Sequence, residues 1–122
     1  MNIKTTLLCV AAISTLAACA TPTELRGRQV TFAASSLAPN AQQTLNCVAK
    51  GWQQATQQSV TVSKFDNGYT AVAESKTLFG TTNTDFVIDS GNARTGGAVF
   101  QLWSTMSKDS TDKLIGIIQP CL

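Results

Sequence analysis

Histidine is absent from this 122-residue chain. Without an imidazole, the chain cannot build a Ser-His or Cys-His nucleophile, a histidine metal site or a histidine pH switch. Charged residues are also scarce, at 13% against about 25% in an average soluble protein, and the net charge is only +2. A nucleic-acid-binding protein normally carries a clear basic excess, so we expect no nucleic-acid partner.

Motifs of the common catalytic sites are missing as well. The chain has no G-x-S-x-G nucleophile elbow, no Walker phosphate loop and no C-x-x-C redox pair. Asp85 and Asp89 share one face of a predicted strand, and a carboxylate pair can hydrolyse glycosides or bind Ca²⁺. The simpler interpretation is a solvated strand face. We therefore expect a non-catalytic protein that holds no cofactor and no metal.

The first twenty residues have the features of a targeting segment. Lys4 gives a basic start, and about 14 apolar or small residues follow over 5–18. That run is shorter than the roughly 20 residues of a membrane span, but it has the length of a signal-peptide core. It ends in Leu16-Ala17-Ala18-Cys19.

This ending resembles the lipobox of bacterial lipoproteins, over positions 1–20. The resemblance implies cleavage before Cys19, diacylglycerol on its thiol and acyl chains such as palmitate on the new amino end. Ordinary secretion, with Ala18-Cys19-Ala20 as an A-x-A cleavage site, is the alternative. Ala20 stands where an Asp would disfavour export to the outer membrane of a Gram-negative cell. We expect a signal peptide over 1–18 and a chain anchored in the bacterial cell envelope, at the outer membrane facing the periplasm.

Beyond the anchor, the sequence predicts a tether and one small α+β domain. Pro22, Gly27 and the lack of apolar periodicity predict a flexible lipidated tether over 19–28, with the domain over 29–122. Residues 29–35 are a candidate short edge strand. An amphipathic helix over 39–57, capped by Ser36 or Asn40, buries one face, and its Gly51 allows another element to approach closely. That face is Ala41, Leu45, Val48, Trp52 and Ala55.

A β-hairpin is the clearest local prediction. Two β-rich runs, 59–65 and 69–75, flank Asn67-Gly68, which is typical of a type I′ turn because both central residues need positive φ. This turn places Val62 opposite Ala73. One face of the hairpin then faces the core, and it consists of Val60, Val62, Tyr69, Ala71 and Ala73.

Two further strands and a C-terminal segment complete the predicted domain. The strands cover 84–89 and 98–106, and the Gly-rich loop 90–97 joins them. Residues 109–122 have helical spacing but a β-rich centre, and a short helix capped by Ser110 or Thr111 is the favoured interpretation. We therefore predict an antiparallel meander of about four strands, with both helices on one face.

The last strand decides which residues the other face presents. A central glutamine is tolerable on a wet surface, so we expect Phe100 and Leu102 to point inward and Trp103 to lie on the opposite face. An exposed Trp103 would resemble the aromatic anchors of binding surfaces. The alternative is that Trp103 packs under the N-terminal segment or a loop.

The four cysteines divide by role. Cys9 leaves with the signal peptide and Cys19 carries lipid, which leaves Cys47 and Cys121 as one disulfide in an oxidising compartment. Closing a loop of this length stabilises the chain by at most about 4 kcal/mol.

Two classes of function fit these features. The helix with Cys47 and Trp52, the hairpin and the terminal Cys121 are loosely similar to small bacterial envelope lipoproteins, a likeness that implies location and architecture only. The first class is a lipid-anchored binding or structural accessory module that docks an envelope protein partner on a flat sheet face. The second is a periplasmic inhibitor or immunity protein against a toxin or cell-wall hydrolase. An inhibitor would insert the loop around Arg94 into an active site.

Overall fold

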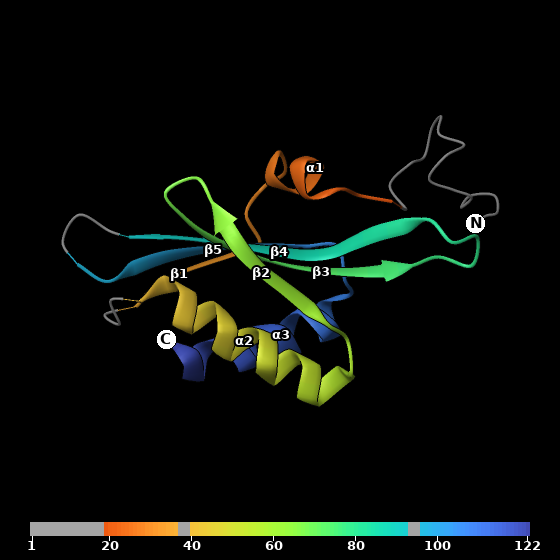
Figure 1. Cartoon of the computed structure of the whole chain (residues 1–122). Helices are drawn as coiled ribbons and strands as arrows, with labels where there is room; N and C mark the ends of the chain where they lie inside the picture. The colour runs from red at the N-terminus through yellow and green to blue at the C-terminus, as the bar shows by residue number, and fades with distance from the viewer. Residues whose placement is uncertain (1–18, 37–39, 93–95) are drawn as a thin grey trace.

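The computed structural model describes residues 19–36, 40–92 and 96–122, and these form one antiparallel sheet with helices on both faces (Figure 1). The strand order is β1-β5-β4-β3-β2. The elements are α1 (Pro22–Arg26), β1 (Phe32–Ser36), α2 (Ala41–Thr56), β2 (Val60–Phe65), β3 (Gly68–Lys76), β4 (Thr82–Asn92), β5 (Ala98–Ser104) and α3 (Lys108–Cys121). The α+β class and the meander β2–β5 are confirmed. The sheet has five strands rather than about four, because β1 pairs with β5 at the edge.

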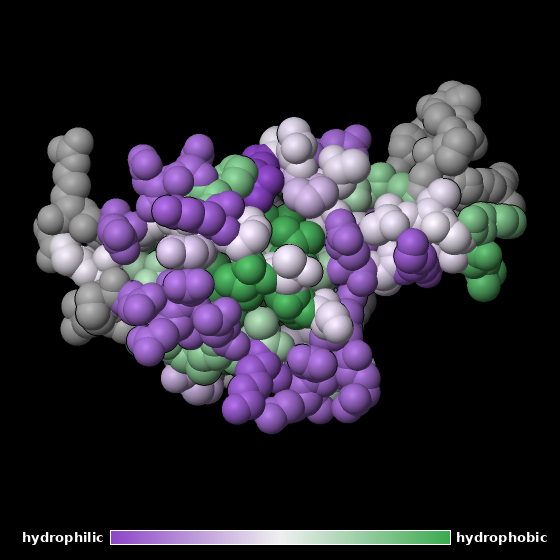
Figure 2. Space-filling view, viewed as in Figure 1, coloured by the Kyte–Doolittle hydropathy of each residue, from purple (hydrophilic) through white to green (hydrophobic). Residues whose placement is uncertain are grey.

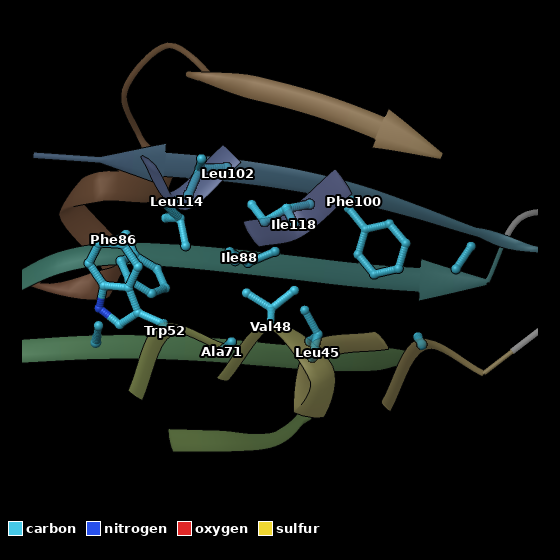
Figure 3. Close-up of a cluster of buried hydrophobic side chains, with 13 residues drawn as sticks. Leu45, Val48, Trp52, Ala71, Phe86, Ile88, Phe100, Leu102, Leu114 and Ile118 are labelled. Atoms are coloured by element: carbon cyan, nitrogen blue, oxygen red, sulfur yellow. The ribbon is translucent and has the colours of Figure 1, made fainter. Parts of the chain in front are cut away.

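The main core lies between the sheet and the two long helices, α2 and α3 (Figures 1 and 3). Leu45, Val48 and Trp52 project from α2 onto Phe86 and other side chains of the sheet. The Trp52 and Phe86 rings meet edge to face, with centroids 5.6 Å apart. The helical periodicity therefore predicted this face, except that its last member, Ala55, is exposed.

A disulfide and a glycine bring the two helices together. Cys47 of α2 and Cys121 at the end of α3 form the predicted disulfide, with their Cα atoms 5.8 Å apart. A Cβ at Gly51 would lie 2.8 Å from Cγ2 of Ile117, closer than ordinary van der Waals contact. Gly51 thus permits the close approach that the sequence suggested, and the approaching element is α3.

The helix caps explain where the helices begin. The Asn40 side chain accepts from the Gln43 amide at 3.0 Å, as one of the two predicted caps. At α3 the prediction of Ser110 or Thr111 is wrong, because Ser107 is the cap and accepts from the Ser110 amide at 3.2 Å. Thr111 is buried, with its hydroxyl 2.9 Å from that of Ser104, so it ties the helix to β5.

The β2–β3 turn differs from the predicted one. Phe65 pairs with Gly68, so the turn residues are Asp66 and Asn67, and Asp66 has φ +52°. Gly68 is the first residue of β3, and only glycine fits there because any Cβ would overlap the carbonyl oxygen of Ser90.

This turn changes the strand register by two residues. Val62 consequently lies opposite Ala71 and not Ala73. A shift of two residues preserves the side-chain alternation of a strand. The predicted core face of the hairpin is therefore retained.

The N-terminal segment covers part of the other face of the sheet, where α1 lies in Figure 1. Ala20 and Leu25 of this segment pack against Val87 and Trp103. Trp103 is only 7% exposed, and its indole N–H donates to the Arg28 carbonyl at 3.2 Å. The prediction of an exposed Trp103 anchor is therefore wrong, and the alternative, packing under the N-terminal segment, is confirmed.

Candidate membrane-anchoring site

The residue after the predicted lipidation site is part of the folded domain. The Ala20 amide donates to Asn83 Oδ1 at 2.8 Å, and the Ala20 carbonyl accepts from the Thr84 amide at 2.9 Å. Ala20 is only 2% exposed. These two bonds fix the backbone beside Cys19 to the start of β4.

A short helix continues from this attachment in place of the predicted tether. Thr21 and Glu24 form a capping box, and Pro22 occupies the first turn of α1. A five-residue helix is not stable alone in water, so tertiary contacts must hold it, and Leu25 supplies one by complete burial. The prediction of a flexible tether over 19–28 is therefore wrong for these residues.

Arg26 fastens the other end of α1 to the sheet. Its Nε lies 2.8 Å from Oδ2 of Asp89, and its second guanidinium nitrogen lies 3.0 Å from Oδ1. The same guanidinium stacks over the Phe65 ring, 3.9 Å from the centroid. The Thr70 hydroxyl completes the group by donating to Asp89 at 2.7 Å. A bidentate pair combined with ring stacking suits arginine and not lysine.

The two aspartates singled out in the sequence act as structural ties. Asp89 binds Arg26, as above, while Asp85 accepts from Ser75, Asn83 and Gln58 at 2.7–3.1 Å. The expectation of a simple solvated face is therefore wrong for this pair. Among residues 19–36, 40–92 and 96–122, no group of three side chains is suited to hold a metal ion.

The β3–β4 turn presents two apolar side chains beside Cys19. Leu78 is fully exposed and Phe79 is 74% exposed. The base of the turn is closed by the Thr77 amide, which donates to the Thr81 carbonyl at 2.8 Å. Cys19 Sγ lies 3.8 Å from Thr81 Oγ1. In Figure 2 apolar atoms protrude at the right-hand end of the molecule, where Figure 1 places this turn. We call Leu78 and Phe79 the apolar tip.

Cys19 itself is partly buried, and it is disulfide-bonded. A single sulfur cannot carry a disulfide and a thioether at the same time. The chemical state of the Cys19 sulfur is therefore directly measurable.

The exposed part of β5 lies away from the apolar tip. Arg94 falls outside the described residues. The face of β5 next to Trp103 leaves Val99 46% exposed. A shallow hollow of about 360 Å³ lies there, between Val99, Gln101 and the β2–β3 turn. This hollow and the apolar tip lie toward opposite ends of β3.

The sequence singled out Cys19 as the candidate lipidation site, but it did not predict α1 or the hydrogen bonds that attach Ala20 to β4. The capping-box pattern Thr21-x-x-Glu24 was a readable signal for α1. No local pattern distinguishes an exposed Leu78 from a buried one, because exposure depends on how the chain folds around it.

Comparisons with protein-family models, with curated proteins and with solved structures find no match. Within the part of the chain that the structure describes, no helix is long and apolar enough to cross a bilayer.

Proposed function

We propose that this chain is a bacterial envelope lipoprotein, anchored through lipid on Cys19, whose domain serves as a non-catalytic binding or accessory module. The observation that carries the proposal is Leu16-Ala17-Ala18-Cys19 after a basic start and an apolar core. Acyl chains contribute about 0.8 kcal/mol per buried methylene, so two or three chains hold a protein on a membrane for long times.

The location of Cys19 supports this proposal. Every described helix and strand lies C-terminal to Cys19, so cleavage before it removes none of them. Cys19 also lies at the edge of the fold, next to Thr81. An acyl chain on its sulfur would extend from one end of the sheet without entering the core.

The polar contacts of the sheet support a non-catalytic role. Asp85 and Asp89 form a candidate catalytic pair, but their carboxylate oxygens are occupied by contacts within the fold. Asp85 accepts hydrogen bonds from Gln58 and Ser75, and Asp89 forms an ion pair with Arg26. The exposed part of the sheet around Val99 offers the shallow surface that an accessory module needs for an envelope partner. We favour this role over an inhibitor, which would need a projecting loop such as the one around Arg94.

Replacement of single cysteines tests the anchor. Cys19→Ser should move the protein from the membrane fraction to the soluble fraction, and the N-terminal peptide should lose the mass of its acyl chains. Cys9→Ser is the matched control, because that residue leaves with the signal peptide. Membrane retention of Cys19→Ser, with an unchanged mature mass, would refute lipid anchoring.

The mass of the Cys19 peptide separates the two states of its sulfur. A thioether resists reducing agents, whereas a disulfide is cleaved by them. We expect an acylated peptide that begins at Cys19 and is unchanged by dithiothreitol. A peptide released by dithiothreitol with a free thiol would instead show that Cys19 is a disulfide residue.

A further inference from the structure

We propose that the apolar tip, Leu78 and Phe79, inserts into the lipid bilayer beside the acylated Cys19. The bilayer would then hold the domain at two adjacent points, one covalent and one through side chains. This inference rests on the lipid anchor proposed above, and it adds a membrane-contacting surface that belongs to the folded domain itself.

The geometry places the tip and the anchor at the same level. Acyl chains on Cys19 bring its sulfur to the boundary between headgroups and hydrocarbon. That sulfur is 3.8 Å from Thr81 Oγ1, and Ala20 is hydrogen-bonded to Asn83 and Thr84, so the anchor cannot move away from β4. Leu78 is only three residues from Thr81 in a turn closed by hydrogen bonds. The tip must therefore lie near the membrane surface whenever Cys19 is lipidated.

The exposure of the tip has no explanation within the fold. Turns are normally polar, yet Leu78 and Phe79 are adjacent and largely exposed, and neither belongs to either apolar cluster of the described residues. Adjacent exposed apolar side chains are typical of contact with a membrane or a partner. Continuity with the lipid anchor favours the membrane.

The charges around the tip suit this location. Residues 75–84 contain no Asp or Glu and one basic residue, Lys76. The turn itself therefore carries no carboxylate that would have to leave water when the tip inserts. A lysine at this depth can extend its ammonium group back to the headgroups while its methylenes remain in apolar surroundings.

A tryptophan placed in the tip tests the insertion. The lipidated protein carrying Phe79→Trp would be reconstituted in phosphatidylethanolamine–phosphatidylglycerol vesicles, with and without brominated acyl chains, which quench indole fluorescence on contact. Asn67→Trp is the matched control, since it adds an exposed indole at the far end of β3. The nine residues of β3 lie between the two sites, and the steps from its first residue to its last span roughly 27 Å at about 3.4 Å per step.

Trp52 and Trp103 also fluoresce in every sample, so the emission of the parent protein in the same vesicles is subtracted. The expected result is that brominated lipid lowers the remaining emission of Phe79→Trp at least twofold and leaves that of Asn67→Trp unchanged. Equal quenching of both variants, or of neither, overturns the tip proposal. A blue-shifted Phe79→Trp emission without bromine quenching also overturns it, because the tip would then be covered by protein.

Flotation of the same samples separates this failure from that of the anchor. Protein that floats with the vesicles but shows no quenching refutes the tip alone. Protein that does not float refutes both the anchor and the tip.

Discussion

The two faces of the sheet are covered in different ways, and each has one tryptophan. On one face, α2 and α3 bury a cluster of thirteen residues around Trp52, whose indole N–H donates to Gln58 at 2.8 Å. On the other, Trp103 lies in a cluster of four, under a five-residue helix. Long helices hold the first face by apolar burial. The second face depends on a few directed contacts, above all those of Arg26.

Removing the disulfide that joins α2 and α3 should have the largest effect. Cys47→Ala combined with Cys121→Ala should lower the free energy of unfolding by up to about 4 kcal/mol, because the unfolded chain regains loop entropy. Urea denaturation of residues 19–122 carrying Cys19→Ser, which is free of the membrane, measures the change. Dithiothreitol should destabilise the parent protein to a similar extent and leave the double variant unaffected. Equal stability of the two proteins would contradict the prediction.

Two leucines of equal burial compare the faces directly. Leu45 is 0% exposed on the α2 side and Leu25 is 1% exposed on the α1 side. Leu45→Ala should cost about 3 kcal/mol and Leu25→Ala about 2 kcal/mol, because the smaller cluster can relax around the cavity. The indole N–H signals of Trp52 and Trp103 in NMR report the two faces separately. Leu25→Ala should speed hydrogen exchange at Trp103 only, and equal acceleration at Trp52 would show that the faces unfold together.

Arg26→Lys should have a smaller effect, confined to the α1 face. Lysine keeps the charge but loses the bidentate pair with Asp89 and the stacking on Phe65, which we expect to cost about 1 kcal/mol. Trp103 should exchange its indole proton faster. Arg28→Lys is the matched control, because the Arg28 side chain is exposed and only its carbonyl contacts Trp103. Identical hydrogen exchange at the Trp103 indole in both variants would show that the Arg26 side chain does not hold α1 against the sheet.

The smallest effect is expected at the exposed ion pair of α3. The hydrogen bond to Asp112, together with its charge, raises the pKa of Lys108 above 10.5. A raised pKa in the folded state means that the pair stabilises the protein below pH 10.5 and that this contribution is lost as the pH rises further. Lys108→Gln should nevertheless leave the melting temperature at pH 7 unchanged, because water screens exposed pairs. A clear drop in the melting temperature of Lys108→Gln at pH 7 would show that the ion pair stabilises the fold.

The two faces also differ in how far the sequence predicts them. Apolar residues repeat every three or four positions in 41–56, and strands alternate in 84–89, so the packing of α2 on the sheet followed from periodicity. For residues 109–122 the same pattern leaves helix and strand open, and a helix is only the favoured interpretation. Helix α1 has five residues and one buried side chain, Leu25, which is too little for periodicity to detect. Its contacts with Asp89 and Trp103 join residues more than sixty positions apart, and such pairs are determined by the fold and not by local pattern.

For the β2–β3 hairpin, the sequence predicted the turn but not the strand register. Asn67-Gly68 correctly indicated a turn between β2 and β3. The observed register differs by two residues, and it places Gly68 where a side chain would overlap the Ser90 carbonyl oxygen of β4. The observed pairing thus suits a glycine at this position through a contact with a later strand, which the hairpin sequence alone does not reveal.

The direct attachment of Ala20 to β4 determines what a partner would meet at the membrane. A flexible tether would let the domain sample a hemisphere of positions and orientations above the lipid. With Ala20 bonded to Asn83 and Thr84, a domain lipidated on Cys19 would instead be attached at one end of its sheet. The surface near Asn67 and Val99 would then lie at most roughly 27 Å above the bilayer, the length of β3 at about 3.4 Å per strand residue. The domain would act as a spacer that selects partners whose binding surface reaches that level.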